Sequence, residues 1–391
     1  MTDAAARGPG EERPSAVLAR VDRELRALWS TEPGETPKAR ACTMNLVVVA
    51  ATPALAEKWL PVVDEVLLGT PARAIVVGLD AGGADGLEAT TTAVCAPGNG
   101  GPLACSERVT LVARGATSAH LPSCVAALCC TDVPTTLVWL GEVHAGDATF
   151  EPLARDASRI VLDAAEGSLA SLARAVYWAR ARAAADRPGV ADLGWTRLAP
   201  WQEMCARMFD EPRLRPLASR VTRVSLVQAS EQGAAMGAAG LLFVGWLATR
   251  LGWKKAAPSS EPGKLPLLRA DGGPVQIVTS ASATSKAPLH ALLAVSLEAS
   301  ADEGTVRGEV AREVGDPDAA TWRLEVTRAG AEPERIEQHV RLRATGPAGL
   351  LERTLHRPTH DAALADAAAW ADGLGGEELA CAGDGDNVRR A

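Results

Sequence analysis

The chain has 391 residues, of which 47% are hydrophobic and 23% are charged. This size and composition predict a globular protein with two domains. A net charge of −8 argues against nucleic acid as a partner, because phosphates would be repelled.

The eight cysteines show no zinc-site or secreted-scaffold spacing, which favours a reducing cytoplasm. The polar Met1–Pro14 segment lacks a secretory apolar core, and the apolar stretch Gly233–Ala248 is shorter than the ~20 residues of a membrane span, so we expect no membrane association.

Residues 1–13 are expected to be a disordered tail, followed by an α/β domain over residues 14–253. Helical spacing of apolar residues predicts a helix from Ser15 to Trp29. Strands are then predicted at Met44–Ala50, Ala74–Leu79, Thr135–Leu140, Ser158–Leu162 and Val221–Val227, and helices at Pro53–Leu67, Ala116–Cys130, Ser168–Ala185, Pro200–Phe209 and Gly233–Leu251. This alternation predicts a mostly parallel, doubly wound sheet with helices on both faces.

An inserted hairpin is predicted, with strands at Ala89–Ala96 and Leu103–Ala113 joined by the turn-rich segment 97–102. This register places Cys95 opposite Cys105. The pair is either a reversible disulfide or two reduced thiols, and a reducing compartment favours thiols. Cys129 and Cys130 are adjacent, and we expect two unbonded thiols there, because a vicinal disulfide requires a strained peptide. These four cysteines are the redox candidates.

Residues 254–273 are expected to form a linker, and 274–372 a smaller α+β domain with an antiparallel sheet. Its strands are predicted at Val275–Ser280, Leu289–Glu298, Gly304–Arg312, Thr321–Thr327 and Arg335–Arg343, and a helix at His360–Asp372, with a frayed tail over 373–391. In the last strand, alternation places Arg335, Glu337, His339, Arg341 and Arg343 on one face. This polar face is expected to be solvated, or alternatively to receive an acidic or phosphorylated partner around His339 and Arg341.

Motifs of enzymes that would suit an α/β fold are missing from the sequence. There is no Walker loop, no G-x-G-x-x-G, no nucleophile elbow and no zinc-binding His-Glu-x-x-His, so we expect no cofactor, no metal and no catalysis. His120, near the start of a predicted helix, is the best lone candidate for a base. Arg73 stands before a strand, where we expect it to pair with Glu107, with contact to a ligand or partner as the alternative.

The segment Asp192–Asp210 concentrates bulky residues without any catalytic motif. Pro200 suits the first position of a helix, whose apolar face carries Trp201. We expect Trp201 in the core. Trp195 and Arg197 would then lie in the loop before the helix and be accessible for docking, since an arginine fork suits a carboxylate of another chain.

Six segments, in this order, resemble the OpcA family of glucose-6-phosphate dehydrogenase assembly proteins. They are Ala41–Ala51, Pro71–Val77, Cys105–Leu111, Asp132–Trp139, Trp195–Trp201 with Phe209-Asp210, and Trp246–Trp253. The resemblance implies a non-catalytic cytoplasmic protein that binds glucose-6-phosphate dehydrogenase and promotes its assembly and activity, as an allosteric activator in the oxidative pentose phosphate pathway of carbohydrate metabolism.

Two other functions remain open at this point. One is a sugar-phosphate-binding protein or small-molecule enzyme that uses the strand ends of the α/β domain, with His120 and Arg73 near the pocket. The other is a thiol-based redox switch, which would require a pair of cysteines that is readily deprotonated.

Overall fold

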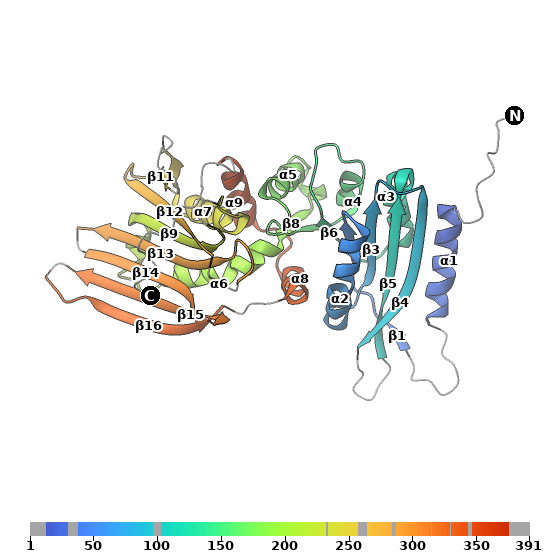
Figure 1. The fold of residues 1–391 in the computed structure, drawn as a ribbon, viewed down its shortest axis with the longest axis horizontal. Coiled ribbons are helices and arrows are strands. Elements are labelled where there is room, and N and C mark those ends of the chain that lie inside the picture. Colours follow the sequence, from blue (N-terminus) through green and yellow to red (C-terminus); the bar gives the residue numbers. More distant parts are fainter. Residues whose placement is uncertain are drawn as a thin grey trace. The chain divides into compact units, whose positions relative to one another are not determined.

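The computed structural model describes residues 13–29, 38–96, 103–231, 234–256, 264–283, 287–302, 304–313, 315–328, 330–342 and 346–374. The predictions for residues 1–12, 97–102 and 375–391, and for Arg343, concern residues outside this part. The chain divides into two compact units, and each is described by itself (Figure 1). Unit 1 comprises residues 1–163, 177–191 and 346–360, and unit 2 comprises 164–176, 192–345 and 361–391.

Unit 1 is built on an eight-stranded sheet, sheet A, in the order β1-β5-β3-β2-β6-β7-β8 with β4 paired to β5. Its strands are β1 (Lys38–Arg40), β2 (Asn45–Ala50), β3 (Arg73–Asp80), β4 (Gly86–Ala96), β5 (Leu103–Arg114), β6 (Thr135–Leu140), β7 (Arg159–Leu162) and β8 (Gly189–Asp192). The pairs from β5 through β3, β2 and β6 to β7 are all parallel. The chain winds outward from β2 and then returns to β6 beside it, which confirms the predicted doubly wound order.

Helices pack against both faces of the strands. They are α1 (Pro14–Ala27), α2 (Pro53–Gly69), α3 (Leu121–Leu128), α4 (Phe150–Asp156) and α8 (Pro347–His356), with short 3-10 turns η1 (Gly115–His120) and η2 (Ala184–Asp186). Helix α5 (Leu169–Arg180) spans the division, since residues 164–176 are assigned to unit 2. Figure 1 shows α1 and α2 on opposite sides of β3, β4 and β5. Because both faces are covered, central strands such as β2 are buried along their whole length.

The hairpin of β4 and β5 is antiparallel and pairs Cys95 with Cys105, so the predicted register is confirmed. The sequence analysis did not predict α8, the helix through which the chain returns to unit 1. Arg159 at the start of β7 is only 6% exposed and donates hydrogen bonds to the carbonyl oxygens of Thr354, Leu355 and Arg357 at 2.7–2.8 Å. These bonds satisfy the last carbonyls of α8, which have no partner within the helix.

Unit 2 contains a second eight-stranded sheet, sheet B, in the order β10-β11-β12-β9-β13-β14-β15-β16. Its strands are β9 (Val221–Ala229), β10 (Lys254–Lys255), β11 (Lys264–Leu268), β12 (Pro274–Ser282), β13 (Leu292–Ala301), β14 (Gly304–Glu313), β15 (Asp316–Arg328) and β16 (Glu334–Arg341). Only β9 and β12 pair in parallel, so the sheet is mostly antiparallel, as predicted.

One face of sheet B is covered by helices. Unit 2 contains α6 (Leu193–Arg207), α7 (Ala238–Leu251) and α9 (Ala362–Asp372), with the turn η3 (Arg215–Arg220). Trp322 of β15 is 3% exposed and donates its indole N–H to the carbonyl oxygen of Met204 in α6 at 2.9 Å. Gly245 of α7 lies so close to Ala367 of α9 that a Cβ there would be 2.5 Å from a backbone oxygen. This close approach explains the small residues of the two helices.

The predicted domain boundaries differ from this division. The segment Val221–Val227 was assigned to the α/β sheet, but it forms β9 in the middle of sheet B. A buried apolar strand looks the same in the sequence of either sheet. The predicted linker 254–273 contains β10 and β11, and the second unit holds about half of the chain rather than a smaller part.

Candidate docking surfaces and a buried carboxylate

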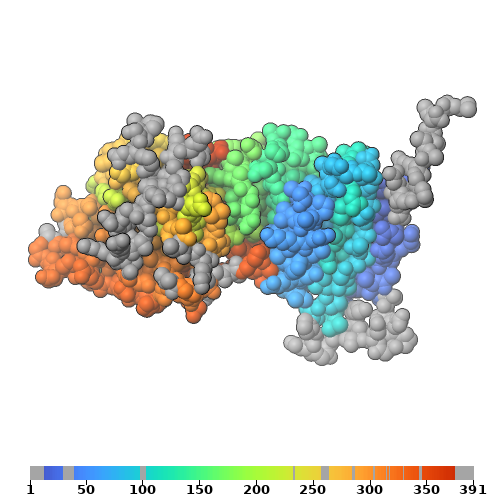
Figure 2. Space-filling model, in the orientation of Figure 1, coloured from blue at the N-terminus to red at the C-terminus, as the bar shows by residue number. Residues whose placement is uncertain are grey.

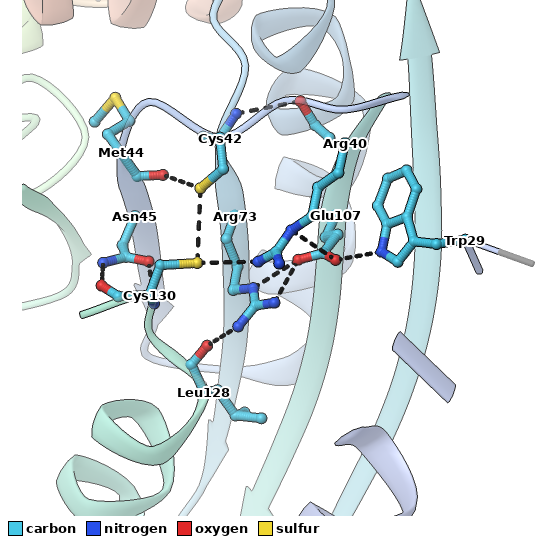
Figure 3. A network of polar contacts seen from close by, with 11 residues as sticks. Trp29, Arg40, Cys42, Met44, Asn45, Arg73, Glu107, Leu128 and Cys130 are labelled. Atoms are coloured by element: carbon cyan, nitrogen blue, oxygen red, sulfur yellow. Dashed lines mark hydrogen bonds and ion pairs between the residues drawn. The ribbon is translucent and has the colours of Figure 1, made fainter. Parts of the chain in front are cut away.

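At the amino end of the parallel strands, a carboxylate is buried among cationic side chains (Figure 3). Glu107 of β5 is 2% exposed, and its oxygens lie 2.6 Å from Arg73 of β3 and 3.2 Å from Arg40 of β1. Trp29, just after α1, donates its indole N–H to the same carboxylate at 2.6 Å. The predicted pair of Arg73 and Glu107 is therefore confirmed. Arg73 also donates to the carbonyl oxygen of Leu128 at 2.8 Å, so its donors are engaged within the unit.

Next to this carboxylate lies a pair of thiols that the sequence analysis missed. The sulfur atoms of Cys42 and Cys130 are 3.7 Å apart, and Arg40 lies 3.2 Å from the Cys130 sulfur. Asn45 holds the Cys130 backbone in place, since its side-chain amide both donates to and accepts from that residue at 2.9 and 2.8 Å. Residues 88 positions apart are thus brought together by the pairing of β2 and β6.

The four predicted redox candidates fall into two situations. Cys95 and Cys105 are bonded, with an S–S distance of 2.02 Å, whereas two thiols were expected. Their direct opposition in the β4–β5 register explains the bond. Cys129 and Cys130 are not bonded to each other. Burial, reinforced by the neighbouring Cys130, raises the pKa of Cys129 to about 11, which disfavours the reactive thiolate.

The carboxyl end of sheet A is where doubly wound folds bind dinucleotides, between the first strand and its neighbour across the switch point. Here β2 is followed by Ala51 and Thr52, and Pro53 then opens α2. The Thr52 hydroxyl caps this helix by accepting from Leu55 N at 3.2 Å. The turn contains no glycine, and Gly78 is so close to Pro53 that a Cβ there would be 2.6 Å from its Cα. These residues do not fit a dinucleotide pyrophosphate.

His120 and Arg73 are not brought together at a pocket. His120 is exposed at the junction of η1 and α3, whereas Arg73 is occupied by Glu107 at the opposite end of the strands. A cavity of about 340 Å³ lies on the sheet face between α3 and α4, and it is mostly apolar. Neither His120 nor Arg73 is among its lining residues, which are Val47, Pro122, Val125, Ala126, Cys129, Thr131, Thr135, Leu137, Leu153 and Asp156.

The tryptophan segment differs from its prediction at Trp195 and Arg197, which lie within helix α6 and not in a loop before it. Trp201 is in the core, 2% exposed, as expected. Trp195 is also buried, at 4%, because the helix begins at Leu193 and not at Pro200. Asp192 caps this helix by accepting from Trp195 N at 2.7 Å, a start signal that outweighs the proline. The Trp195 indole donates to Asp361 at 2.9 Å. Arg197 is half-buried on α6.

The polar face of β16 is at the surface of sheet B. His339 and Arg341 are 75% and 73% exposed, and their side chains contact Glu313 at 2.7 Å and Asp316 at 3.9 Å. Hydrogen bonding to Glu313, and then the charge of that carboxylate, raise the pKa of His339. Residues of β14 to β16, orange in Figure 2, lie at the surface of this view.

Comparison with known proteins decides the family. Residues 63–177 match a family profile described as the glucose-6-phosphate dehydrogenase subunit N-terminal domain. Residues 188–368 match the corresponding C-terminal domain. The chain belongs to the OpcA family.

The putative OxPP cycle protein OpcA of Nostoc punctiforme is 30% identical over 215 residues, which cover 53% of this chain and 44% of that protein. The protein with the same description from Synechocystis sp. is 29% identical over 211 residues, covering 52% and 42%. The matched part therefore spans less than half of these OpcA relatives.

A 3-ketoreductase, KijD10 of Actinomadura kijaniata, aligns with a TM-score of 0.46 and 10% identity over 87% of this chain and 99% of that chain. Within the described residues, no helix is both long and apolar enough to cross a membrane.

Proposed function

We propose that this chain is a non-catalytic, cytoplasmic assembly partner and allosteric activator of glucose-6-phosphate dehydrogenase in the oxidative pentose phosphate pathway. The observation that carries the proposal is the match of two successive OpcA family profiles, both described as subunit domains of that enzyme. The turn after β2, which does not fit a pyrophosphate, supports a role without a bound dinucleotide. A protein of this kind activates an enzyme by binding its active assembly more tightly than the alternative states.

The test combines the purified chain with the dehydrogenase of the same cell. We expect higher activity at limiting glucose 6-phosphate, together with a larger assembled species in light scattering. An unchanged rate and an unchanged particle size, under both reducing and oxidising conditions, would refute the proposal. Calorimetry of the chain alone should show no tight binding of NADP, and micromolar affinity would favour a small-molecule enzyme instead.

Docking is proposed to involve Arg197 of α6 and the exposed pair His339 and Arg341 of β16. Arg197→Ala and Arg341→Ala are therefore expected to weaken binding to the dehydrogenase, and Arg341→Ala, at an exposed position, to leave the melting temperature unchanged. Arg155→Ala, at an exposed position of α4 in the other unit, is the matched control. If Arg197→Ala destabilises the fold and spares activation, α6 is part of the scaffold and docking has to be assigned to β16.

A second candidate function is redox control of the same complex, which is favoured by the 3.7 Å separation of Cys42 and Cys130. Bond formation would remove one proton and one electron from each thiol, and a disulfide oxidant would be reduced to two thiols in exchange. Activation by wild-type chain should then change after oxidation, and activation by Cys42→Ser should not. Equal activation by both proteins before and after oxidation would exclude this function.

A further inference from the structure

Sheet B has two chemically different faces. On β9, β13 and β14, Val224, Leu297 and Val310 point toward the helices and are at most 2% exposed. The residues between them point the other way and stay partly exposed, and they are mainly small or charged. We call this second surface the outer face of sheet B. An antiparallel sheet commonly leaves one face in water, but a broad face of this kind is also a common site of sheet-on-sheet contact.

Charges of alternating sign cross the outer face in one row perpendicular to the strands. From β9 to β16 the row consists of Arg223, Glu298, Arg307, Glu325 and Arg335, and each residue is the direct cross-strand partner of the next. Arg307 is 67% exposed and lies 3.6 Å from Glu298. Arg335 is 73% exposed and lies 2.9 Å from Glu325. Two ion pairs therefore form within one chain, and their side chains stay 38–73% exposed and accessible to a partner.

We propose that the outer face of sheet B is the interface between two copies of this chain, related by a two-fold axis that runs parallel to the strands between β13 and β14. Such an axis turns one sheet face onto the other, so β13 of one copy lies opposite β14 of its partner. Glu298 then faces the partner subunit's Arg307. One strand further out, Arg223 faces the partner subunit's Glu325. Every charge of the row that meets a charge meets the opposite sign.

Neighbouring positions are compatible with close approach along this axis. Ala294 and Ala311 are cross-strand partners, as are Ser296 and Glu309. The same rotation therefore places alanine opposite alanine and serine opposite glutamate. Packed sheets cross at about 30°, so contacts near the axis are preserved best. The central cluster thus contains Glu298 and Arg307 from each copy.

Other axes between neighbouring strands fit less well. Lys264 of β11 pairs with Val278 and lies in the same cross-strand row as Arg323 of β15. An axis between β9 and β13 would place β11 opposite the partner's β15. Lys264 would then face the partner's Arg323, and like charges would meet. An axis between β14 and β15 would overlap only β13 to β16, because β16 is the last strand of the sheet order. The chosen axis overlaps β12 to β16 together with β9, and so buries more surface. It also covers the β16 face that carries His339 and Arg341, so docking of the dehydrogenase there requires this interface to open.

The test uses the full chain and two charge reversals at the centre of the interface. Wild-type protein is expected to form dimers in analytical ultracentrifugation, with weaker association at high salt. Arg307→Glu and Glu298→Arg each place like charges opposite one another, so each should dimerise more than about tenfold more weakly. An equimolar mixture of the two variants restores opposite charges across the interface and should form a heterodimer.

The mixing step separates the interface from effects within one chain, because a reversal that merely perturbed its own sheet would not be rescued by the other variant. Circular dichroism melts establish that both variants fold, and Arg155→Glu on α4 is the control outside the face. Monomeric wild type, single variants that dimerise as tightly as wild type, or a mixture that associates no better than either variant alone would each overturn the proposal. If wild type is monomeric but Arg307→Glu loses binding to the dehydrogenase, the face serves that enzyme and not a second copy. The dimer test contains no dehydrogenase, so it can fail or succeed independently of the proposed function.

Discussion

Glu107 illustrates how strongly the surroundings of one residue determine its contribution to stability. Glu107→Gln would leave Arg73, only 14% exposed, without its opposite charge, and removing one member of a buried ion pair costs about 3–5 kcal/mol. We expect a loss of this size in urea unfolding. The control is Glu88→Gln in the same hairpin, since Glu88 is 63% exposed beside Arg114 and should matter little. Equal losses in the two variants would show that burial does not control this site.

His339 provides a test of pH dependence. Its pKa is raised above the ordinary value by Glu313, so the contact stabilises the folded protein at pH below about 6.5. That contribution is lost as the pH rises through the raised pKa of the folded state. Titration of the His339 ring resonances by NMR should give a lower pKa in Glu313→Gln than in wild type. The resonance is assigned with His339→Gln, and identical titration curves would contradict the contact.

At the level of residues, contacts were predictable where a strand register fixed them. Arg73 with Glu107 and Cys95 with Cys105 followed from neighbouring strands. The pairing of Cys42 with Cys130 was not predictable, because it depends on β2 lying beside β6, and sequence spacing does not show which strands cross over.

Among the elements, α6 shows how one cap changes the exposure of a side chain. Trp195→Ala is expected to cost about 3–5 kcal/mol through the lost packing of a buried aromatic ring. Trp195→Phe retains most of this packing and loses only the bond to Asp361, which also caps α9 by accepting from Leu364 N at 3.0 Å. It should therefore cost less. Thermal melts of both variants compare the two contributions, and an unchanged melting temperature in Trp195→Ala would show that Trp195 is not core.

The β4–β5 hairpin gives a second test at this scale. A bond between Cys95 and Cys105 closes a ten-residue separation, and the chain-entropy relation predicts about 2–3 kcal/mol for a loop of that size. The double variant Cys95→Ser, Cys105→Ser should be less stable by this amount under oxidising conditions and equal to reduced wild type. Activation of the dehydrogenase should not change. Mass spectrometry with and without reductant establishes whether the bond is present.

Most helices and strands were predictable from apolar period and turn residues, including β6 with its exact limits. The sheet to which each strand belongs was harder to predict, and β9 was placed in the wrong one. β9 is rich in apolar and β-branched residues, as the strands of sheet A are. α8 is a short helix whose last carbonyls are bound by Arg159, nearly two hundred positions away. Long-range pairing of this kind leaves no local pattern.

For the whole molecule, the chain order of unit 1 predicts the effect of truncation. Residues 346–360 belong to unit 1, although most of unit 2 precedes them. A chain ending at residue 345 would leave the buried guanidinium of Arg159 without its carbonyl acceptors, so unit 1 is expected to unfold at a lower temperature and less cooperatively. A chain ending at residue 374 is the control. Hydrogen exchange at β7 should rise only in the shorter chain, and equal protection in both would refute the role of α8.

The path of the chain also bears on its synthesis. The polypeptide passes between the two units five times, at 163/164, 176/177, 191/192, 345/346 and 360/361. Domains usually fold in order as they leave the ribosome, at about 5–20 residues per second. Here the first unit lacks its last segment until position 360 has emerged. At that rate, Arg159 of the nascent β7 is without its carbonyl acceptors in α8 for roughly ten to forty seconds. During this interval the unfinished sheet is open to chaperones, and completion of the two units is nearly simultaneous.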